Sequence, residues 1–203
     1  MTKPRSRNRT KQQQILNAAT ELFTEQGYHA TSMALIAQHA NVSKQTVYSH
    51  FGSKEELFAA AIEQKCDTSG LLDINHIDLS DPKSALLAVA KRFFLMVTSK
   101  EALAVHKICA YESKKYPQLS ELFYQAGPER LTADVAKLLA ELNARQLISI
   151  KAPHTAAVQF LLLMKGEAWG RVEFNTPKQL SNAEIDEYLS DSVDFFLRGY
   201  SPE

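Results

Sequence analysis

The chain has 203 residues, 45% of them hydrophobic and 23% charged, which is enough for one large hydrophobic core or two small ones. No hydrophobic run approaches the roughly 18 residues of a membrane-spanning helix. The charged N-terminus is not followed by the hydrophobic region of a signal peptide, so we expect a cytoplasmic protein with no membrane partner. The two cysteines, Cys66 and Cys109, lie far apart and lack a CxxC spacing, which argues against a disulfide framework or a zinc site.

The charges are balanced overall but unevenly distributed. Basic and acidic side chains number 23 each. Up to Lys54 the chain carries seven basic and two acidic residues, a net charge of seven minus two, or +5, so the remainder carries −5. A basic N-terminal quarter indicates a polyanionic partner in that region, although a merely solvated tail would show the same pattern.

The first expected element after a basic flexible tail at residues 1–9 is a helix with Thr10 as its N-cap. Gly27 is expected to end this helix as a C-cap glycine does. The hydrophobic residues of the helix recur on one face, at Ile15, Leu16, Ala19, Leu22 and Phe23.

Two short helices are expected next, and the turn between them is brief. Ser32 is placed to cap the first, Asn41 to Ser43 forms the break, and Ser43 caps the second. Ser53 with Glu56 makes a capping box for the following helix. This order predicts a helix-turn-helix domain over residues 10–54, followed by a connecting helix and linker over residues 55–80.

The rest of the chain predicts further helices and no alternating strand pattern. We expect the fold to be all-α, with a second helical domain over residues 81–203. Its helices are predicted over residues 82–99, 100–115, 117–146, 153–170 and 182–198, the third with a kink at Gly127–Pro128.

The second short helix has the chemistry of a surface that reads DNA. A helix fits the major groove, where base edges offer a distinguishable hydrogen-bonding code, and cations beside the helix can bind phosphates. Val47 and Phe51 share the hydrophobic side of this helix. That spacing leaves Gln45, Thr46 and Tyr48 on other sides, although an ordinary helical corner could look the same.

Two sequence stretches resemble the N-terminal domain of the TetR family of transcriptional regulators. They are I-L-N-A-A-x-E-L-F-x-E-Q-G-Y from Ile15 to Tyr28, and the stretch from Thr31 to Phe58 that contains V-S-K-Q-T-V-Y-S-H-F and K-E-E-L. The resemblance implies a homodimer that binds a pseudo-palindromic double-stranded DNA operator. It further implies a repressor that a small-molecule effector releases from DNA.

The resemblance also implies roles for single residues. Lys44, Gln45 and Tyr48 match positions that contact bases or nearby backbone. The residues Ser32, Thr46, His50 and Lys54 match phosphate-contacting positions. Gln45, Ser49 and Ala34 differ from the side chains common in the family. Ser49 is still expected to face the DNA, with no particular base or phosphate assigned to it. A glutamine at position 45 could pair with the N6 and N7 atoms of adenine.

The second domain gives weaker signals about its ligand and its dimer interface. Polar or aromatic side chains among hydrophobic ones could line a pocket, as could ordinary core or surface residues, and the candidates are His106, Cys109, Tyr111 and Trp169. The resemblance implies that the last two helices form a four-helix bundle across a two-fold axis. The interface candidates are Leu161, Gly166, Val193 and Phe196.

No enzyme motif competes with this interpretation. The sequence contains neither GxSxG nor HExxH, and no glycine-rich loop that could cradle a phosphate. We expect no enzymatic activity, no cofactor and no metal. The alternatives kept open are a transcriptional activator and an architectural DNA-binding protein.

Overall fold

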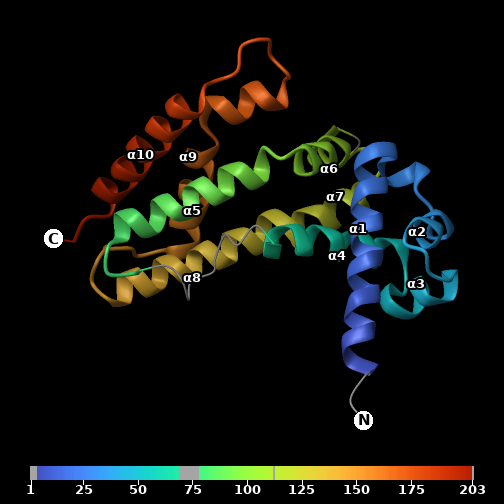
Figure 1. Ribbon diagram of the computed structural model, residues 1–203. Coiled ribbons are helices and arrows are strands. Elements are labelled where there is room, and N and C mark those ends of the chain that lie inside the picture. Colours follow the sequence, from blue (N-terminus) through green and yellow to red (C-terminus); the bar gives the residue numbers. More distant parts are fainter. Residues whose placement is uncertain (1–3, 69–77, 112, 203) are drawn as a thin grey trace. The chain divides into compact units, whose positions relative to one another are not determined.

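The computed structural model describes residues 4–68, 78–111 and 113–202 (Figure 1). Within these ranges the regular secondary structure is entirely helical, which confirms the predicted all-α fold. The chain divides into two compact units. Unit 1 comprises residues 1–65 and 100–127, and unit 2 comprises residues 66–99 and 128–203.

Unit 1 contains the predicted helix-turn-helix, and its hydrophobic positions are buried as the periodicity indicated. Ile15, Ile36, Val47 and Leu57 are each 0% exposed. Figure 1 shows α2 and α3 as two short helices beside α1. The helices of this unit are α1 (Pro4–Ala30), α2 (Met33–His39), α3 (Lys44–Phe51), α4 (Lys54–Thr68), α6 (Lys100–Tyr111) and α7 (Pro117–Tyr124).

The first helix begins earlier than predicted. It starts at Pro4 instead of Thr10, so most of the expected flexible tail is helical, while residues 1–3 of that tail lie outside the described residues. Proline suits a first helical position because its missing N–H would have no partner there. Near the other end, Gly27 leaves the helical conformation (φ 79°, ψ 167°) where the end was expected, and a further turn continues to Ala30.

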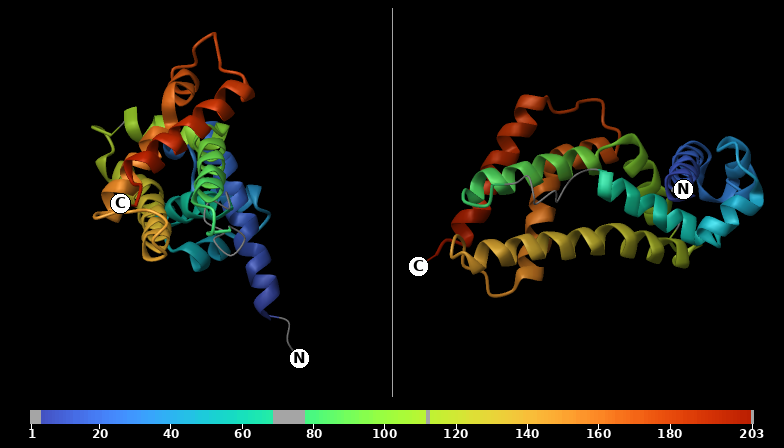
Figure 2. Two further views of the ribbon diagram at one scale, coloured as in Figure 1. Left: turned by 90° about the vertical axis from the view of Figure 1, so that its left-hand side faces the viewer. Right: turned by 60° about the horizontal axis from the view of Figure 1, so that its bottom comes forward.

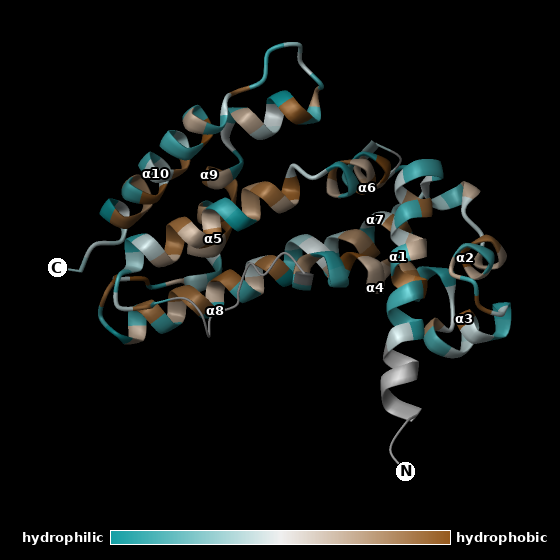
Figure 3. Ribbon diagram, in the orientation of Figure 1, coloured by the Kyte–Doolittle hydropathy of each residue, from teal (hydrophilic) through white to brown (hydrophobic). Residues whose placement is uncertain are grey.

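Unit 2 is built from α5 (Pro82–Val97), α8 (Arg130–Ala144), α9 (Pro153–Glu173) and α10 (Asn182–Gly199). Hydrophobic residues recur along α5 and α8 in Figure 3, and they form the core of this unit with α9 and α10. None of the described helices combines the length and hydrophobicity that crossing a membrane requires. Residues 69–77 of the expected linker lie outside the described residues.

The predicted second domain, residues 81–203, is not one compact unit. Its helices α6 and α7 belong to unit 1 because Cys109 and Leu119 are buried in the core of that unit. Ile108 and Phe123 also pack against this core. The predicted kink at Gly127–Pro128 is present as a π-helical turn, Gln125–Glu129, between α7 and α8.

Helix α9 changes direction at Gly166, a feature that the sequence did not predict. Gly166 has φ 53° and ψ −163°, and both views in Figure 2 show the bend. Carbonyl groups next to such a break lose their partners within the helix. The Tyr188 hydroxyl of α10 donates a hydrogen bond of 2.8 Å to the carbonyl of Leu163 and thereby satisfies one of them.

Candidate nucleic-acid interface

The corner between α2 and α3 is fixed by backbone geometry. Asn41 has a positive φ of 52°, a conformation that asparagine tolerates better than most residues. The Asn41 N–H donates to the Gln38 carbonyl at 3.1 Å, and the Val42 N–H donates to the Ala37 carbonyl at 2.9 Å. These two bonds form a Schellman motif, which ends α2 where the sequence predicted the break.

Both short helices begin at serine caps, as predicted. Ser32 Oγ accepts a hydrogen bond from the Leu35 N–H at 3.1 Å, and Ser43 Oγ accepts one from the Thr46 N–H at 3.1 Å. Each cap satisfies a donor that the first turn would leave unpaired. The start and direction of α3 are therefore set by local hydrogen bonds on both sides of the corner.

Helix α3 has one buried and one exposed side. Val47 and Phe51, one turn apart, are 0% and 6% exposed and anchor the helix to the core of unit 1. The opposite side is formed by the exposed side chains of Lys44, Gln45, Tyr48 and Ser49. The structure thus brings together, on one helix face, the residues for which we expected base contacts.

The side chains on this exposed side differ in how free they are to bind a partner. The side chain of Gln45 is exposed and makes no hydrogen bond within the described part of the chain, so its amide is available. Ser49 Oγ donates to the carbonyl of Thr46 at 2.8 Å, which engages its only proton. Lys44 Nζ lies 5.7 Å from the centroid of the Tyr48 ring. Gln45, Lys44 and Tyr48 are therefore better placed than Ser49 to donate hydrogen bonds to DNA.

The remaining expected phosphate contacts lie at helix ends beside this face. Ser32 caps α2, while Thr46 and His50 are half-buried on α3, one turn apart. The Thr46 hydroxyl shares a 2.8 Å hydrogen bond with Ser43 Oγ. Lys54 is the first residue of α4, where the positive end of the helix dipole adds to its charge.

Lys54 has a neighbour that sequence reasoning missed. Its Nζ lies 4.1 Å from the centroid of the Tyr28 ring, and the Tyr28 hydroxyl donates a 2.8 Å hydrogen bond to Glu55 Oε1. Burial lowers the pKa of Lys54, while the nearby Glu55 carboxylate raises it in part. No local sequence signal connects Tyr28 with Lys54, because the two residues lie 26 positions apart in the chain.

The expected pocket residues belong to different units of the chain. His106, Cys109 and Tyr111 lie on α6 in unit 1, whereas Trp169 lies on α9 in unit 2. Cys109 is 2% exposed in a hydrophobic core, and burial raises the pKa of its thiol to about 12. Tyr111 is 62% exposed. Spacing along one helix could not reveal that its residues face opposite ways.

Three of the expected interface residues are buried within the chain. Leu161, Val193 and Phe196 are 8%, 0% and 3% exposed, because they fill the core between the helices of unit 2 itself. Gly166 is the bend of α9, where its missing side chain makes room for the Tyr188 ring. The exposed hydrophobic residues of the last two helices are instead Val158, Leu162, Tyr188 and Phe195.

Comparison with protein families matches both parts of the chain. Residues 15–61 match the model of the bacterial regulatory proteins of the tetR family. Residues 84–202 match the model of the AefR-like transcriptional repressor C-terminal domain. The first match covers the helix-turn-helix, including Gln45 and Lys54, and the second covers more than half of the chain.

Individual relatives agree with these matches. A TetR-family transcriptional regulator from Mesorhizobium loti is 30% identical, with a TM-score of 0.75 over 96% of this chain and 98% of that one. The flavonoid-responsive regulator FrrA is 32% identical, with a TM-score of 0.73 over the same shares.

Curated relatives match smaller parts. The regulator UidR of Escherichia coli K12 is 27% identical over 161 residues, 70% of this chain and 82% of UidR. The activator FasR of Mycolicibacterium smegmatis is 40% identical over 83 residues, which span 40% of this chain and 37% of FasR. With a capped helix-turn-helix, two matching family models and similar full-length structures, the chain belongs to the TetR family of DNA-binding transcriptional regulators.

Proposed function

We propose that the chain acts as a homodimeric repressor that binds a pseudo-palindromic operator and is released from it by a small molecule. The observation that carries the proposal is the exposed face of α3, where Lys44, Gln45 and Tyr48 stand opposite the buried Val47 and Phe51. A helix that is anchored on one side and rich in hydrogen-bonding groups on the other suits the major groove. The alternative is a transcriptional activator. It is supported by the relative FasR, which is described as a transcriptional activator.

Dimerisation is supported by the exposed hydrophobic residues of α9 and α10. Leu162 on α9 is 62% and Phe195 on α10 is 60% exposed. The two helices are joined to one another by hydrogen bonds from the Tyr188 hydroxyl to the carbonyl of Leu163 and from the Tyr200 hydroxyl to Gln159. A two-fold partner would cover this surface and place two copies of α3 on consecutive half-sites.

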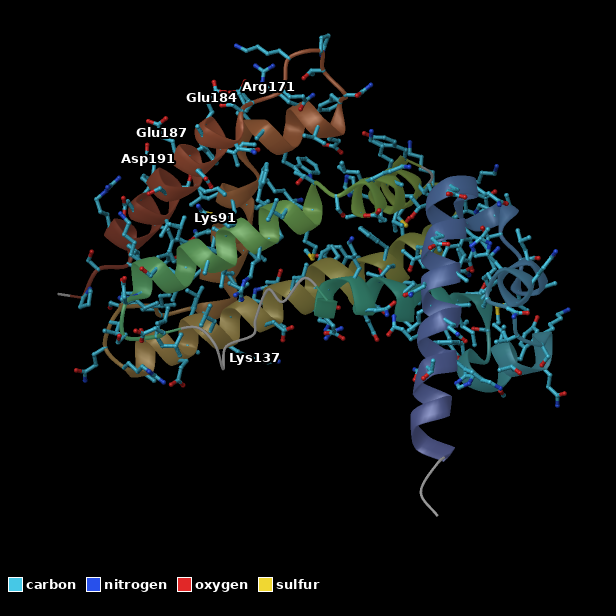
Figure 4. All side chains as sticks on the ribbon, viewed as in Figure 1. Lys91, Lys137, Arg171, Glu184, Glu187 and Asp191 are labelled. Atoms are coloured by element: carbon cyan, nitrogen blue, oxygen red, sulfur yellow. The ribbon has the colours of Figure 1, made fainter. Side chains whose placement is uncertain are left out.

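Charges on α10 indicate where the edge of this interface would lie. Figure 4 shows Glu184, Glu187 and Asp191 following one another along α10. Two other carboxylates of α10 are paired with α5, Asp186 with Lys91 and Asp194 with Lys83, both at 2.8 Å. Like charges favour the solvated rim of an interface, so the three labelled carboxylates are assigned to the rim.

Support for a small-molecule effector comes from relatives. FrrA is described as flavonoid-responsive. AibR, whose structure contains isovaleryl coenzyme A and operator DNA, shares the fold at 22% identity and a TM-score of 0.55. Of the expected pocket residues we retain Trp169, which packs against the core of unit 2. Lys165 Nζ lies 4.4 Å from the centroid of the Trp169 ring.

The proposal is tested by selecting bound fragments from genomic DNA and comparing their affinity with that of random duplexes. At about physiological salt a specific regulator binds its site at least about a thousandfold more tightly than random DNA. A ratio near one for every selected fragment would refute the operator proposal and favour architectural binding. A reporter gene under the selected sequence then distinguishes repression from activation.

Gln45→Ala is expected to change which bases are preferred. The Gln45 amide is free in the described structure and could pair with an adenine, and a lost bidentate contact costs about 1–3 kcal/mol at that base pair. The measurement is affinity for operator variants substituted at each position. If the Gln45→Ala protein keeps the wild-type base preference at every position, Gln45 does not contribute to base recognition.

Lys54→Ala is expected to weaken binding to all sequences alike. A lysine that contacts a phosphate displaces roughly one counterion, so the slope of log affinity against log salt should fall in magnitude by about one. The exposed Lys137 of α8, in unit 2, provides the control. Lys137→Ala should leave the slope unchanged, and an unchanged slope for Lys54→Ala would contradict the phosphate assignment.

A further inference from the structure

A buried aromatic ring lies directly beneath a cation of the proposed DNA-binding surface. Lys54 Nζ is 4.1 Å from the centroid of the Tyr28 ring, and Tyr28 is only 7% exposed. The separation is well inside the roughly 6 Å within which a ring face attracts an ammonium. We propose that Tyr28 is a positioning residue for DNA binding, whose ring holds the Lys54 ammonium where it meets a phosphate. This inference rests on the proposed function.

The Tyr28 ring is held firmly enough to position another side chain. It stacks on Phe23 at 5.6 Å between centroids and meets Phe58 edge-on at 5.1 Å. Its hydroxyl donates a 2.8 Å hydrogen bond to Glu55 Oε1. Ring contacts and a hydrogen bond together leave Tyr28 one orientation, so the core of unit 1 determines where the Lys54 ammonium rests.

The hydrogen bond to Glu55 also makes the ring a better partner for a cation. A phenol that donates to a carboxylate shifts electron density toward its ring, and hydrogen bonds polarise one another in this way. Burial and the Glu55 carboxylate both raise the pKa of Tyr28, so the hydroxyl remains a donor at neutral pH. The same bond draws the Glu55 carboxylate toward Tyr28.

A ring holds an ammonium without neutralising it. Lys65, Lys83 and Lys91 are each paired with a carboxylate at 2.8 to 3.1 Å, whereas the described chain offers Lys54 no such ion pair. An arriving phosphate would therefore meet an ammonium that is not engaged in a direct ion pair and whose rotamers are already restricted. Partial burial, which lowers the pKa of Lys54, also means that less hydration is lost on contact.

The test varies the ring electrons and keeps the shape of the core. Tyr28→Phe serves as the reference, and phenylalanine with one, two or three ring fluorines is then placed at position 28. Each fluorine withdraws density from the ring face and weakens its attraction for a cation. Affinity for a random-sequence duplex, measured by fluorescence anisotropy, should fall stepwise to about one fifth of the reference. The salt slope should stay constant, because the number of phosphate contacts does not change.

The same series in a Lys54→Ala background provides the matched control. There the affinity should be independent of fluorination, because the cation is absent and effects on packing are common to both series. An equal decline in both backgrounds, or no decline in either, would overturn the inference. Wild-type protein that fails to distinguish selected from random DNA would instead overturn the proposed operator function, so the two failures are separable.

Discussion

Gly166→Ala is expected to destabilise the protein by about 3 kcal/mol or more. The backbone at Gly166 (φ 53°, ψ −163°) lies in a region that residues with a side chain rarely adopt, which costs of order 1–3 kcal/mol. An added Cβ would also lie 2.4 Å from Cε1 of Tyr188, and overpacking of this kind costs another ~1–3 kcal/mol. Urea unfolding at a fixed protein concentration measures the change.

Gly170→Ala in the same helix is the matched control. Gly170 is helical and a Cβ there would meet nothing within 4 Å, so alanine should be neutral or stabilising by about 0.5–1 kcal/mol. Adding Tyr188→Ala to Gly166→Ala should recover the part of the loss caused by the ring contact. Equal stability of the Gly166→Ala and Gly170→Ala proteins would show that the bend of α9 is not a constraint on the fold.

Phe195→Glu is expected to dissociate the dimer and thereby weaken operator binding by about a hundredfold or more. Phe195 is 60% exposed on α10, and a carboxylate there would be buried without a partner at the proposed two-fold interface. A monomer presents one α3 helix at a time and loses the gain from joined half-sites. Sedimentation gives the oligomeric state, and anisotropy gives the operator affinity.

Leu95→Glu separates this effect from the general cost of an added charge. Leu95 is 69% exposed in the same unit but belongs to α5 and to neither of the two helices proposed to form the interface. It should leave both the dimer and operator binding intact. A Phe195→Glu protein that remains dimeric at micromolar concentration would refute the assignment of this surface.

Most of the helices could be predicted because their signals are local. The serine caps at Ser32, Ser43 and Ser181 each bond to backbone N–H groups within three residues. Hydrophobic periodicity likewise depends on neighbours three or four positions away. One local prediction was wrong, since α1 begins at Pro4 instead of Thr10.

The sequence predicted the DNA-facing side of α3 for the same reason. Burial of Val47 and Phe51 leaves the other side of a single helix to solvent, so Gln45 and Tyr48 follow from spacing alone. Family resemblance then supplied the expected roles, which the matching family models support only at the level of DNA-binding transcription regulation. The sequence by itself thus determined the all-α class, the helix-turn-helix and the family.

Only the tertiary structure decided which hydrophobic faces pack within the chain. Leu161 and Leu162 are adjacent and chemically identical, yet they are 8% and 62% exposed. Tyr28 reaches Lys54, and Tyr188 reaches Gly166, across long stretches of chain. Contacts of this kind depend on how distant helices meet, which periodicity along one helix does not encode.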